Sequence, residues 1–546
     1  MKLKQIIFLL TLTFTASIAF SQVQQVSSLH SMILTGDPIL EDIRYLSVKT
    51  GYPFLSLTPP LSPAEVRNFI NYIDESVLSD YDFEVYGRIL DKLSVHPPFL
   101  SWSLDDLFTI HVNISSAFDL TYNFNSAISA LSQIPKSAPL FSMPVRLFIF
   151  DSLQLYIDPI VDVKPFNGGI GITNIPDGFP AEYWPIRAFA SVGGPWWNFY
   201  IGRDHLAWGT AHSGNLIYSN EIPFYDFAYL SFFTPKFKYS IIINHLPLKL
   251  ERSLFDVPPL GWSTWENRMS EHRYFYLHRM DIILFNRISF SAMEGVMVGN
   301  SPLELKYLNP MIIFHSMHPW NSYQKWLPGT ADGKEGSTVG AFLSFEVNLN
   351  IIKPLAVYGQ FVMNQVATQG ELNAAIPPPN GLGYLAGIHY THTFNTWSSL
   401  FYAEFVYTSP YVYVLSSPFA SFIHRDNNFY LLGHSRDTVL LTAGANFTNI
   451  NNTLKFYGNF SWTAKGEHNR NGLKWDHIET QEAFDAKSPT GTAENCFILS
   501  FDAEWKLLSW LVFKANITGI YSVNNNHIHG NNEVGGQTSL SVSIHF

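Results

Sequence analysis

The sequence predicts an all-β protein, a large antiparallel transmembrane β-barrel of about 16–18 strands that follows a small α-helical part. Three observations lead to this fold class. The chain begins with a secretory signal, aromatic residues make up 16% of it while charged residues make up 14%, and its last residues alternate between apolar and polar. Few charges and many aromatic residues suit a surface that faces lipid. No apolar run after the signal approaches the roughly 18 residues of a membrane helix, so a membrane-spanning chain must cross as a closed barrel.

A signal peptide is expected over residues 1–21. Lys2 and Lys4 give it a positive start, residues 6–18 form an apolar core, and Ala19 and Ser21 are small residues at the positions that a signal peptidase recognises. Such a segment is removed from the mature protein and takes no part in the fold. Its presence predicts export from the cytoplasm.

The mature chain is acidic and holds one cysteine. Of the 33 basic residues, two lysines leave with the signal, so 31 basic residues remain against 44 acidic ones, a net charge of −13. A chain of this charge is a poor binder of nucleic acid. Because Cys496 has no second cysteine to pair with, no intrachain disulfide can form.

Residues 36–100 are expected to form a small helical periplasmic domain. Apolar residues recur at helical spacing in three stretches, residues 37–51, 61–73 and 81–93. In the second stretch Ser62 is placed as N-cap, and Glu65 three residues later completes a capping box. Nothing in this part has the pattern of a catalytic site.

Residues 101–546 are expected to form the barrel, because the apolar period changes there from helical to two. The clearest hairpin lies in residues 341–365, where a short IIKP turn joins two alternating strands. Within the hairpin of residues 496–522, the face opposite the apolar one carries Asp502, Glu504, Lys514 and Asn516. A charged inner face predicts a polar lumen, whereas a soluble barrel would have an apolar interior.

The lengths of the connections and the last strand fit the same fold. Short turns alternate with long polar connections, around residues 255–272, 315–337, 365–380 and 463–493. Outer-membrane barrels have short periplasmic turns and longer outer loops. At the end of the chain Leu540, Val542, Ile544 and Phe546 share one face. An edge strand of a soluble sandwich could show this alternation, but an exported chain that ends in a strand-terminal Phe is more similar to an outer-membrane barrel.

Two stretches resemble the Wzi-type capsule assembly proteins, which are outer-membrane barrels that anchor capsular polysaccharide. The first is WWNFYIGRDHLAWGTAHSGNLIYSNEIPFYDFAYLSFF, with matching residues Gly202, Arg203, Trp208, Gly209, Gly214, Leu216, Ser219, Asn220 and Pro223. The second is HRMDIILFNRISFSAMEGVMVG followed by LKYLNPMIIFH, with His278, Arg279, Glu294, Tyr307, Asn309 and Pro310. The stretch LAVYGQFVMNQ and the helical start also resemble the family. The resemblance implies a barrel that handles polysaccharide and carries no catalytic residues.

Sugars are held by aromatic faces that stack on their rings and by carboxylate, amide and guanidinium groups that bond to hydroxyls, and Arg pairs bidentately with acidic sugars. The candidate glycan-binding residues are Arg203, His205, Trp208, Asn220, Arg279 and Glu294. The alternative interpretation is that Trp208, Gly209 and Asn220 build a tight turn that folds inward and plugs the barrel.

Three rival functions are weighed against glycan binding. A metal site would need more than the pairs His205–His212 and His389–His392, since no cluster of Asp, Glu or Cys accompanies them at ligand spacing. An outer-membrane hydrolase could use His212-Ser213 or His434-Ser435, but neither pair lies in a G-x-S-x-G elbow. A porin or nutrient uptake channel is compatible with a polar lumen, and conductance would distinguish it from a plugged barrel.

We therefore expect a non-catalytic protein of the cell outer membrane that binds and anchors or organises a surface or capsular polysaccharide. Its expected partners are that polysaccharide and outer-membrane lipid. No nucleic acid, cofactor or metal is expected, and the chain is expected to be a monomer.

Overall fold

The computed structural model describes residues 30–94, 98–104, 107–125, 128, 140–150, 152–161, 163–166, 169–172, 187–218, 222, 224–246, 272–299, 301–314, 339–366, 371–373, 379–415, 420–422, 435–469 and 485–546. The expected signal peptide and Asn220 lie outside these residues. Within the described part of the chain, none of the helices is long and apolar enough to cross a membrane.

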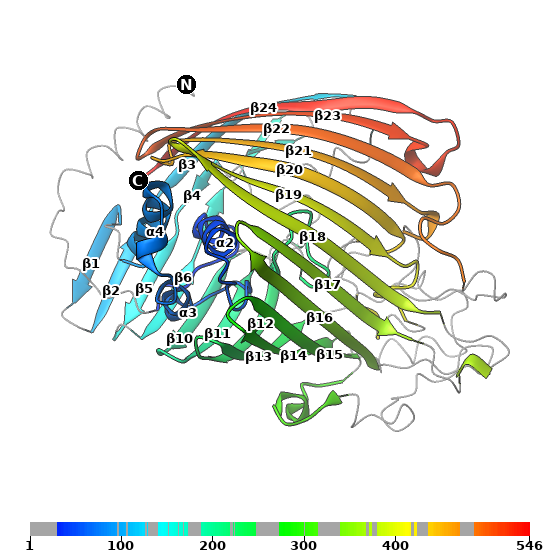
Figure 1. Cartoon of the computed structure of the whole chain (residues 1–546), viewed down its shortest axis with the longest axis horizontal. Helices are drawn as coiled ribbons and strands as arrows, with labels where there is room; N and C mark the ends of the chain where they lie inside the picture. Colours follow the sequence, from blue (N-terminus) through cyan, green and yellow to red (C-terminus); the bar gives the residue numbers. More distant parts are fainter. Residues whose placement is uncertain are drawn as a thin grey trace.

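Most of the described residues belong to one large antiparallel sheet. Its long strands are β10 (Ala188–Gly193), β11 (Trp197–Asp204), β12 (Tyr225–Phe233), β13 (Phe237–His245), β14 (Arg273–Leu284), β15 (Ile288–Gly299), β16 (Val339–Ile352), β17 (Leu355–Gln365), β18 (Gly381–Phe394), β19 (Trp397–Thr408), β20 (Thr438–Asn449), β21 (Leu454–Lys465), β22 (Glu494–Leu508), β23 (Leu511–Val523) and β24 (Glu533–His545). Each pairs with the next along the chain, as Figure 1 shows for the curved wall.

Shorter strands close this sheet into a ring. They are β1 (Leu100–Leu104), β2 (Phe108–Val112), β3 (Ser115–Phe124), β4 (Phe141–Ser142), β5 (Val145–Ile149), β6 (Leu153–Ile157) and β7 (Ile160–Val161); β8 (Val163–Phe166) and β9 (Gly169–Ile172) form a separate hairpin. The pairs β2 and β3, β4 and β5, and β6 and β7 each continue one another after a two-residue break. β24 pairs with β3, and β10 pairs with β6. β1 pairs with β2 and lies beside the ring. Without β1, and with each continued pair counted once, the described residues form a closed ring of 18 strands, which confirms the predicted barrel.

The two faces of the barrel differ as the alternation predicts. Large apolar side chains are exposed on the outer face of neighbouring strands, for example Leu441, Phe460, Phe501, Ile517 and Leu540. On the inner face of β22 and β23, Asp502 accepts a hydrogen bond from the Asn516 amide at 2.8 Å, and Lys514 lies 3.1 Å from Glu504. The predicted polar inner face is therefore present, and the apolar outer face is that of a barrel in an outer membrane.

Three α-helices precede the barrel: α2 (Ile39–Thr50), α3 (Pro63–Ile70) and α4 (Asp80–Lys92), with a short 3-10 helix η1 (Glu75–Val77) between the last two. The predicted capping box is present at α3, where Ser62 and Glu65 exchange side-chain to backbone hydrogen bonds. A second capping box, formed by Ser79 and Asp82, begins α4. Their apolar faces pack into one small core that includes Ile43, Val66 and Val85.

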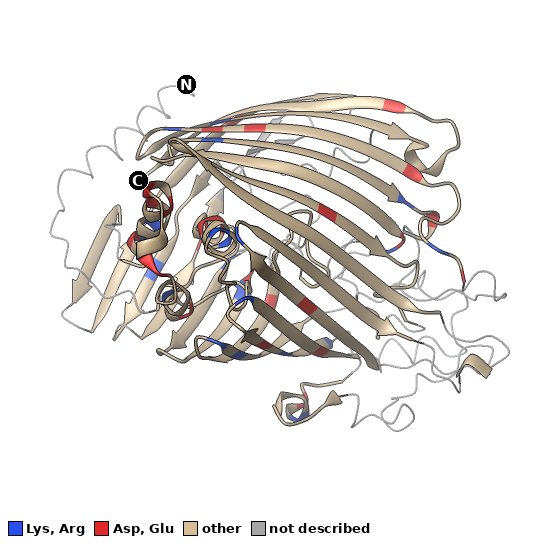
Figure 2. Ribbon diagram, viewed as in Figure 1, with Lys and Arg blue, Asp and Glu red and all other residues tan. Residues whose placement is uncertain are grey.

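The helices lie at the end of the barrel that carries the short turns and the C-terminus (Figure 1). Tyr81 donates to the backbone oxygen of Thr448, and Lys49 donates to Thr393 at 2.7 Å, both near short turns between strands. Charged residues are frequent on the helices and sparse along the strands (Figure 2). The long connections leave from the opposite end, although much of their length lies outside the described residues.

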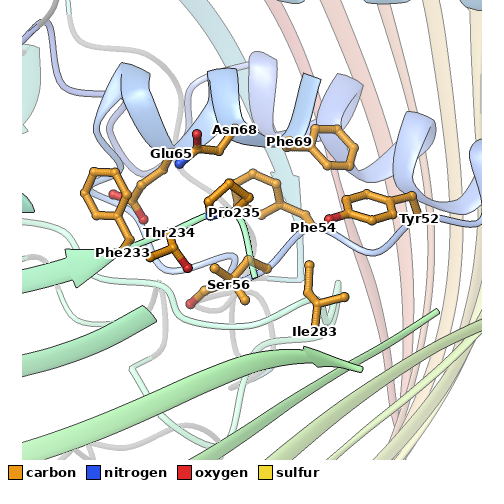
Figure 3. Close-up of a pocket in the computed structure, with 11 residues that line it drawn as sticks. Tyr52, Phe54, Ser56, Glu65, Asn68, Phe69, Phe233, Thr234, Pro235 and Ile283 are labelled. Carbon is orange, nitrogen blue, oxygen red and sulfur yellow. The ribbon is translucent and has the colours of Figure 1, made fainter. Parts of the chain in front are cut away.

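A small pocket marks the seam between the helices and the barrel (Figure 3). Aromatic residues of the helical part line one side of it, and the turn between β12 and β13 lines the other. Its described lining includes Tyr52, Phe54, Ser56, Glu65, Asn68, Phe69, Phe233, Thr234, Pro235 and Ile283. The helical part thus packs directly against the barrel.

Candidate functional site

The connection between β11 and β12 folds into the barrel, and we call its described residues 205–218 the inner connection. Its central side chain, Trp208, is 1% exposed. The indole Nε1 donates to the backbone oxygen of Pro59 at 3.1 Å, and the next backbone N–H, that of Gly209, donates to Leu57 at 2.9 Å. Because protein encloses the indole, it offers no free face to a sugar ring in this conformation.

Gly209 is required by this close approach. Its φ is +128°, in a region that residues with a Cβ atom rarely adopt. A Cβ atom there would collide with the side-chain amides of Gln360 and Asn215. Those two amides bond to each other at 2.9 Å, and Gln360 also accepts the N–H of Leu216. Glycine therefore allows the inner connection to lie against the barrel wall.

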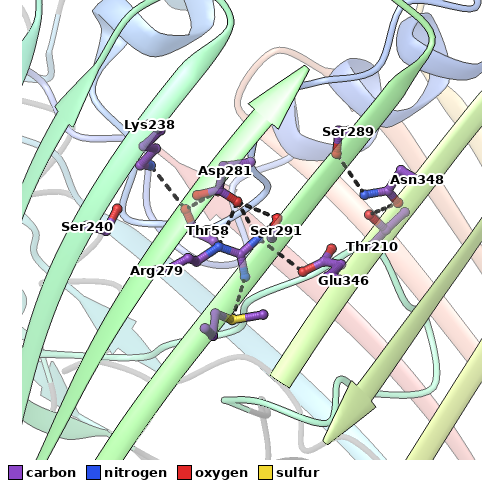
Figure 4. Close-up of polar contacts among 12 residues, drawn as sticks. Thr58, Thr210, Lys238, Ser240, Arg279, Asp281, Ser289, Ser291, Glu346 and Asn348 are labelled. Carbon is purple, nitrogen blue, oxygen red and sulfur yellow. Dashed lines mark hydrogen bonds and ion pairs between the residues drawn. The ribbon is translucent and has the colours of Figure 1, made fainter. Parts of the chain in front are cut away.

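Charged networks join the inner connection and the helical part to the inner wall (Figure 4). Lys238 on β13 is fully buried, pairs with Glu65 of α3 and donates to Thr58 at 3.1 Å. Beside it, Arg279 on β14 donates to Asp281 at 2.8 Å and to Glu346 at 3.1 Å. A buried charge is tolerated only when it is paired and hydrogen-bonded in this way.

The same network reaches the indole and the residue after Gly209. The Arg279 guanidinium lies 5.8 Å from the ring centre of Trp208, which places these two predicted site residues in contact. Thr210 donates to Asn348 at 2.9 Å, and Asn348 donates to Ser289 at 3.2 Å. Trp208 and Arg279 are thus parts of the interior that holds the inner connection.

Glu404 on β19 binds the far tip of the inner connection. Its carboxylate accepts the backbone N–H groups of His212 at 2.7 Å and Ser213 at 2.8 Å, and the Tyr358 hydroxyl at 2.5 Å. The His212 ring shares a hydrogen bond with His389 between their Nε2 atoms, 3.0 Å apart. These contacts fix the tip against β17, β18 and β19. Burial, and then the nearby charge of Arg44, hold the pKa of His212 well below its ordinary value, so this imidazole is neutral near pH 7.

The positions of the histidines and of Ser213 do not form the metal site or the serine–histidine pair that the alternative functions need among the described residues. His389 is buried on the inner face, whereas His392 on the same strand is exposed on the outer one. In the described residues, no three His, Cys, Asp or Glu side chains converge as metal ligands. The buried Ser213 hydroxyl has no hydrogen-bond partner among the described residues, so His212 does not act as its base in this conformation. His434 lies outside the described residues.

A row of polar and aromatic side chains crosses the outer face where β11 to β14 end, on the side of the long connections. We call Arg203, Asp226, His245 and Tyr274 the rim row, because each faces the next across neighbouring strands. Arg203 binds Asp226 bidentately at 2.7 and 2.9 Å. The ring of His245 stacks on Tyr274, and its Nε2 lies 3.0 Å from His272 Nδ1 in a solvent-exposed contact.

Phe224, which is buried, lies next to the rim row, with the Arg203 guanidinium 4.2 Å from its ring centre. Guanidinium, carboxylate, imidazole and phenol groups therefore lie together at one end of the barrel, next to a buried aromatic ring. These polar groups can bond to sugar hydroxyls. Of the predicted site residues, only Arg203 belongs to the rim row.

The other predicted site residues lie apart from the rim row. His205 follows β11 and accepts a hydrogen bond from Thr35 at its backbone oxygen. Burial lowers the pKa of His205. Glu294 lies on the outer face of β15, where it accepts the backbone N–H of Phe314 at 2.9 Å. The sequence prediction did not include Asp226, His245 or Tyr274; the signal that could have found them is a group of polar residues at adjoining strand ends.

Comparison with known proteins identifies the fold. No protein-family model matches the sequence, and no curated protein sequence matches it. The structure is similar to that of Wzi from Escherichia coli, an outer-membrane protein involved in group 1 capsule assembly and described as a carbohydrate-binding β-barrel. The TM-score is 0.57 at 12% identity, over 93% of this chain and 98% of that chain. The chain has the Wzi-type barrel fold.

Weaker matches are porin-like barrels of Pseudomonas aeruginosa. OprD gives a TM-score of 0.39 at 9% identity, covering 82% of this chain and 97% of its own. OccK2 gives a TM-score of 0.37 at 8% identity, covering 80% of this chain and 97% of its own. The Wzi-type fold confirms the resemblance found in the sequence at the level of fold and places the chain among outer-membrane barrels.

Proposed function

We propose that this protein binds a surface polysaccharide at the rim row and retains it at the outer membrane, without catalysis. The observation that carries the proposal is the bidentate Arg203–Asp226 pair set beside Phe224. A carboxylate that binds the guanidinium bidentately holds it in a fixed plane, and a planar guanidinium suits hydroxyl or carboxylate groups of a sugar.

Position supports the same function. The rim row lies where the strands lead into the long connections, opposite the helices and the short turns. In an outer-membrane barrel the long connections face outward. A polysaccharide outside the cell would therefore reach the rim row without entering the barrel. The carbohydrate binding described for Wzi of Escherichia coli agrees with this proposal.

The test compares cell-bound and released polysaccharide in a deletion strain that carries the wild-type gene or variants. In the double variant Arg203→Ala with Tyr274→Ala, we expect polymer to be made but shed into the medium, as in the deletion strain. Lys514→Ala, on the inner face of β23, is the matched control and should retain polymer. Retention by the double variant, with the barrel folded in the membrane, would contradict the proposal.

A second candidate function, a channel for small solutes, rests on a different observation. Part of the inner wall is accessible to solvent: the Lys514 side chain is 54% exposed, and Gln537 and Asn123 meet in an exposed hydrogen bond. Ionic conductance of the purified barrel in a planar bilayer would test it. Stable conductance that Lys514→Glu changes in ion selectivity would support a channel, and a silent barrel would exclude one.

A further inference from the structure

One segment of the chain packs on the outside of the barrel. Residues 301–314, which we call the outer strap, follow β15 and contain the short 3-10 helix η5 (Leu305–Leu308), the green helix below β15 in Figure 1. Tyr307 and Phe314 of the outer strap form a buried apolar cluster with Tyr276, Val296 and Val298 of the wall. Those three wall residues lie on the outer face of β14 and β15, the face that bears lipid elsewhere on the barrel.

The outer strap binds three polar side chains on the outer face of β14 and β15. His278 Nε2 lies 2.9 Å from the backbone oxygen of Tyr307. Glu294 accepts the N–H of Phe314 at 2.9 Å, and the hydroxyl of Tyr276 accepts the N–H of Glu304 at 2.9 Å. His278 and Glu294 are cross-strand neighbours. Facing lipid directly, these groups would have no hydrogen-bond partners.

The height of this contact follows from strand geometry. Glu294 lies six residues beyond the start of β15 at the short-turn end. A strand rises about 3.3 Å per residue and is tilted by about 40° in such a barrel, so Glu294 lies roughly 15 Å above the short-turn end. This height is past the middle of an apolar band about 25 Å tall. The outer strap begins beyond Gly299 and returns toward this level, so it lies beside the outer half of that band.

The face of the outer strap that points away from the barrel is apolar. Leu303 is 47% exposed, Leu305 72%, Met311 86% and Ile313 62%. Lys306 and Glu304, the charged residues of the outer strap, pair with each other. Single exposed apolar residues are ordinary, but four on one 14-residue segment form a patch that water disfavours.

We propose that the outer strap is a lipid-contact element that lies in the outer leaflet, with Leu303, Leu305, Met311 and Ile313 against acyl chains. The occupant is lipid rather than a second copy of the chain, because the patch continues the exposed apolar face of the same wall, as at Met280 on β14. The barrel wall is thus two layers thick at this point, with polar side chains sealed between the layers.

Spin labelling tests the proposal on the full chain. The single native cysteine is replaced by Cys496→Ser, and labels are attached at Met311→Cys or Leu305→Cys. The protein is reconstituted in vesicles of phosphatidylethanolamine and phosphatidylglycerol. Leu540→Cys, on the exposed apolar face of β24, is the lipid control, and Phe83→Cys, exposed on α4, is the water control. Collisions with oxygen and with a water-soluble nickel chelate are then compared.

The labels at residues 305 and 311 should collide with oxygen more than with the nickel chelate, as at residue 540, and the ratio should be reversed at residue 83. A ratio like that of residue 83 would overturn the proposal. Dipolar broadening between labels at residue 311 would also overturn it, since it would identify a second copy of the chain as the occupant.

A second pair of variants tests how the outer strap is held. Glu294→Gln keeps an oxygen that can accept the N–H of Phe314, whereas Glu294→Leu does not. With folding checked by heat-modifiable gel migration, the label at residue 311 should become several-fold more mobile in Glu294→Leu and stay unchanged in Glu294→Gln. Equal mobility in both variants would contradict the sealing role of Glu294.

Discussion

The inner wall of the barrel has two regions. Both arise from the same alternation of apolar and polar residues along the strands, but one is covered by other parts of the chain, and we call it the covered region, whereas the other, the uncovered region, is open to solvent. Along β11 to β19 the inner connection and the helices lie on the wall, and large or charged side chains such as Tyr229, Lys238 and Glu404 are almost fully buried. Along β20 to β24 and β3 the inner face carries polar groups, and Lys514 and Asp502 are open to solvent. The wall of the first region therefore contacts the inner connection and the helices, and the wall of the second region contacts water.

The difference shows why charge alone does not identify function in a barrel. The Lys238–Glu65 pair and the Lys514–Glu504 pair are both inward-facing ion pairs. The first links two parts of the chain far apart in sequence and is sealed from water, whereas the second joins neighbouring strands in an accessible lumen. Burial therefore decides what each pair contributes to stability.

The largest expected effect comes from breaking the buried pair. Lys238→Met removes the partner of Glu65 and leaves a buried carboxylate uncompensated, which costs about 3–5 kcal/mol. Denaturant unfolding of the detergent-solubilised protein measures this loss. Adding Glu65→Gln, which keeps an oxygen that can accept the Ser62 N–H of the capping box, should recover much of the stability, because both charges are then gone. If the double variant is no more stable than Lys238→Met, the pair does not act as proposed.

A smaller effect is expected at the tip of the inner connection. Glu404→Gln keeps the shape of the side chain but removes the charge that accepts two backbone N–H groups, and charge-assisted hydrogen bonds contribute about 1.5–3 kcal/mol. Amide hydrogen exchange at residues 211–215 should become faster, while exchange in β22 and β23 stays unchanged. Uniformly faster exchange throughout the barrel would mean that Glu404 supports the whole fold rather than the tip.

Acidification should weaken the covered region more than the uncovered one. In the folded chain burial lowers the pKa of His212 below its ordinary value of 6.5, so the unfolded chain binds a proton first as the pH falls. The contribution of His212 to the free energy of unfolding is therefore constant above about pH 6.5 and decreases as the pH falls below that value. His212→Gln should flatten this dependence between pH 7.5 and 5.5 in thermal unfolding. An unchanged slope would show that other groups set it.

The fold was largely predictable because barrel strands alternate at short range. The alternation around Leu540 and the polar face of Asp502 and Lys514 both appear in the structure as predicted. The capping box of Ser62 and Glu65 depends on four consecutive residues and was equally visible. Local patterns of this kind need no knowledge of how the ring closes.

The partners inside the barrel were not predictable in the same way. Lys238 meets Glu65, and Glu404 meets His212, only after the ring has closed around distant segments. A sequence signal did exist for Glu294. It is a carboxylate among the outward-facing, mostly apolar residues of β15, which indicates that something other than lipid covers it. Two interpretations of Trp208 were open from the sequence, sugar binding and a turn that folds inward, because a buried indole with a bonded Nε1 serves packing as well as an exposed one serves a sugar.

The smallest stability effect is expected in the uncovered region. Lys514→Ala breaks an ion pair with Glu504 whose lysine is half exposed, and such pairs contribute about 0–1 kcal/mol. Unfolding should therefore match that of the wild type within that range, in contrast to Lys238→Met. Measured side by side in the same detergent, the two lysine variants test the comparison directly. A similar loss of stability in both would mean that the lumen along β22 and β23 is sealed from water, because only a dry environment makes the removal of one partner so costly.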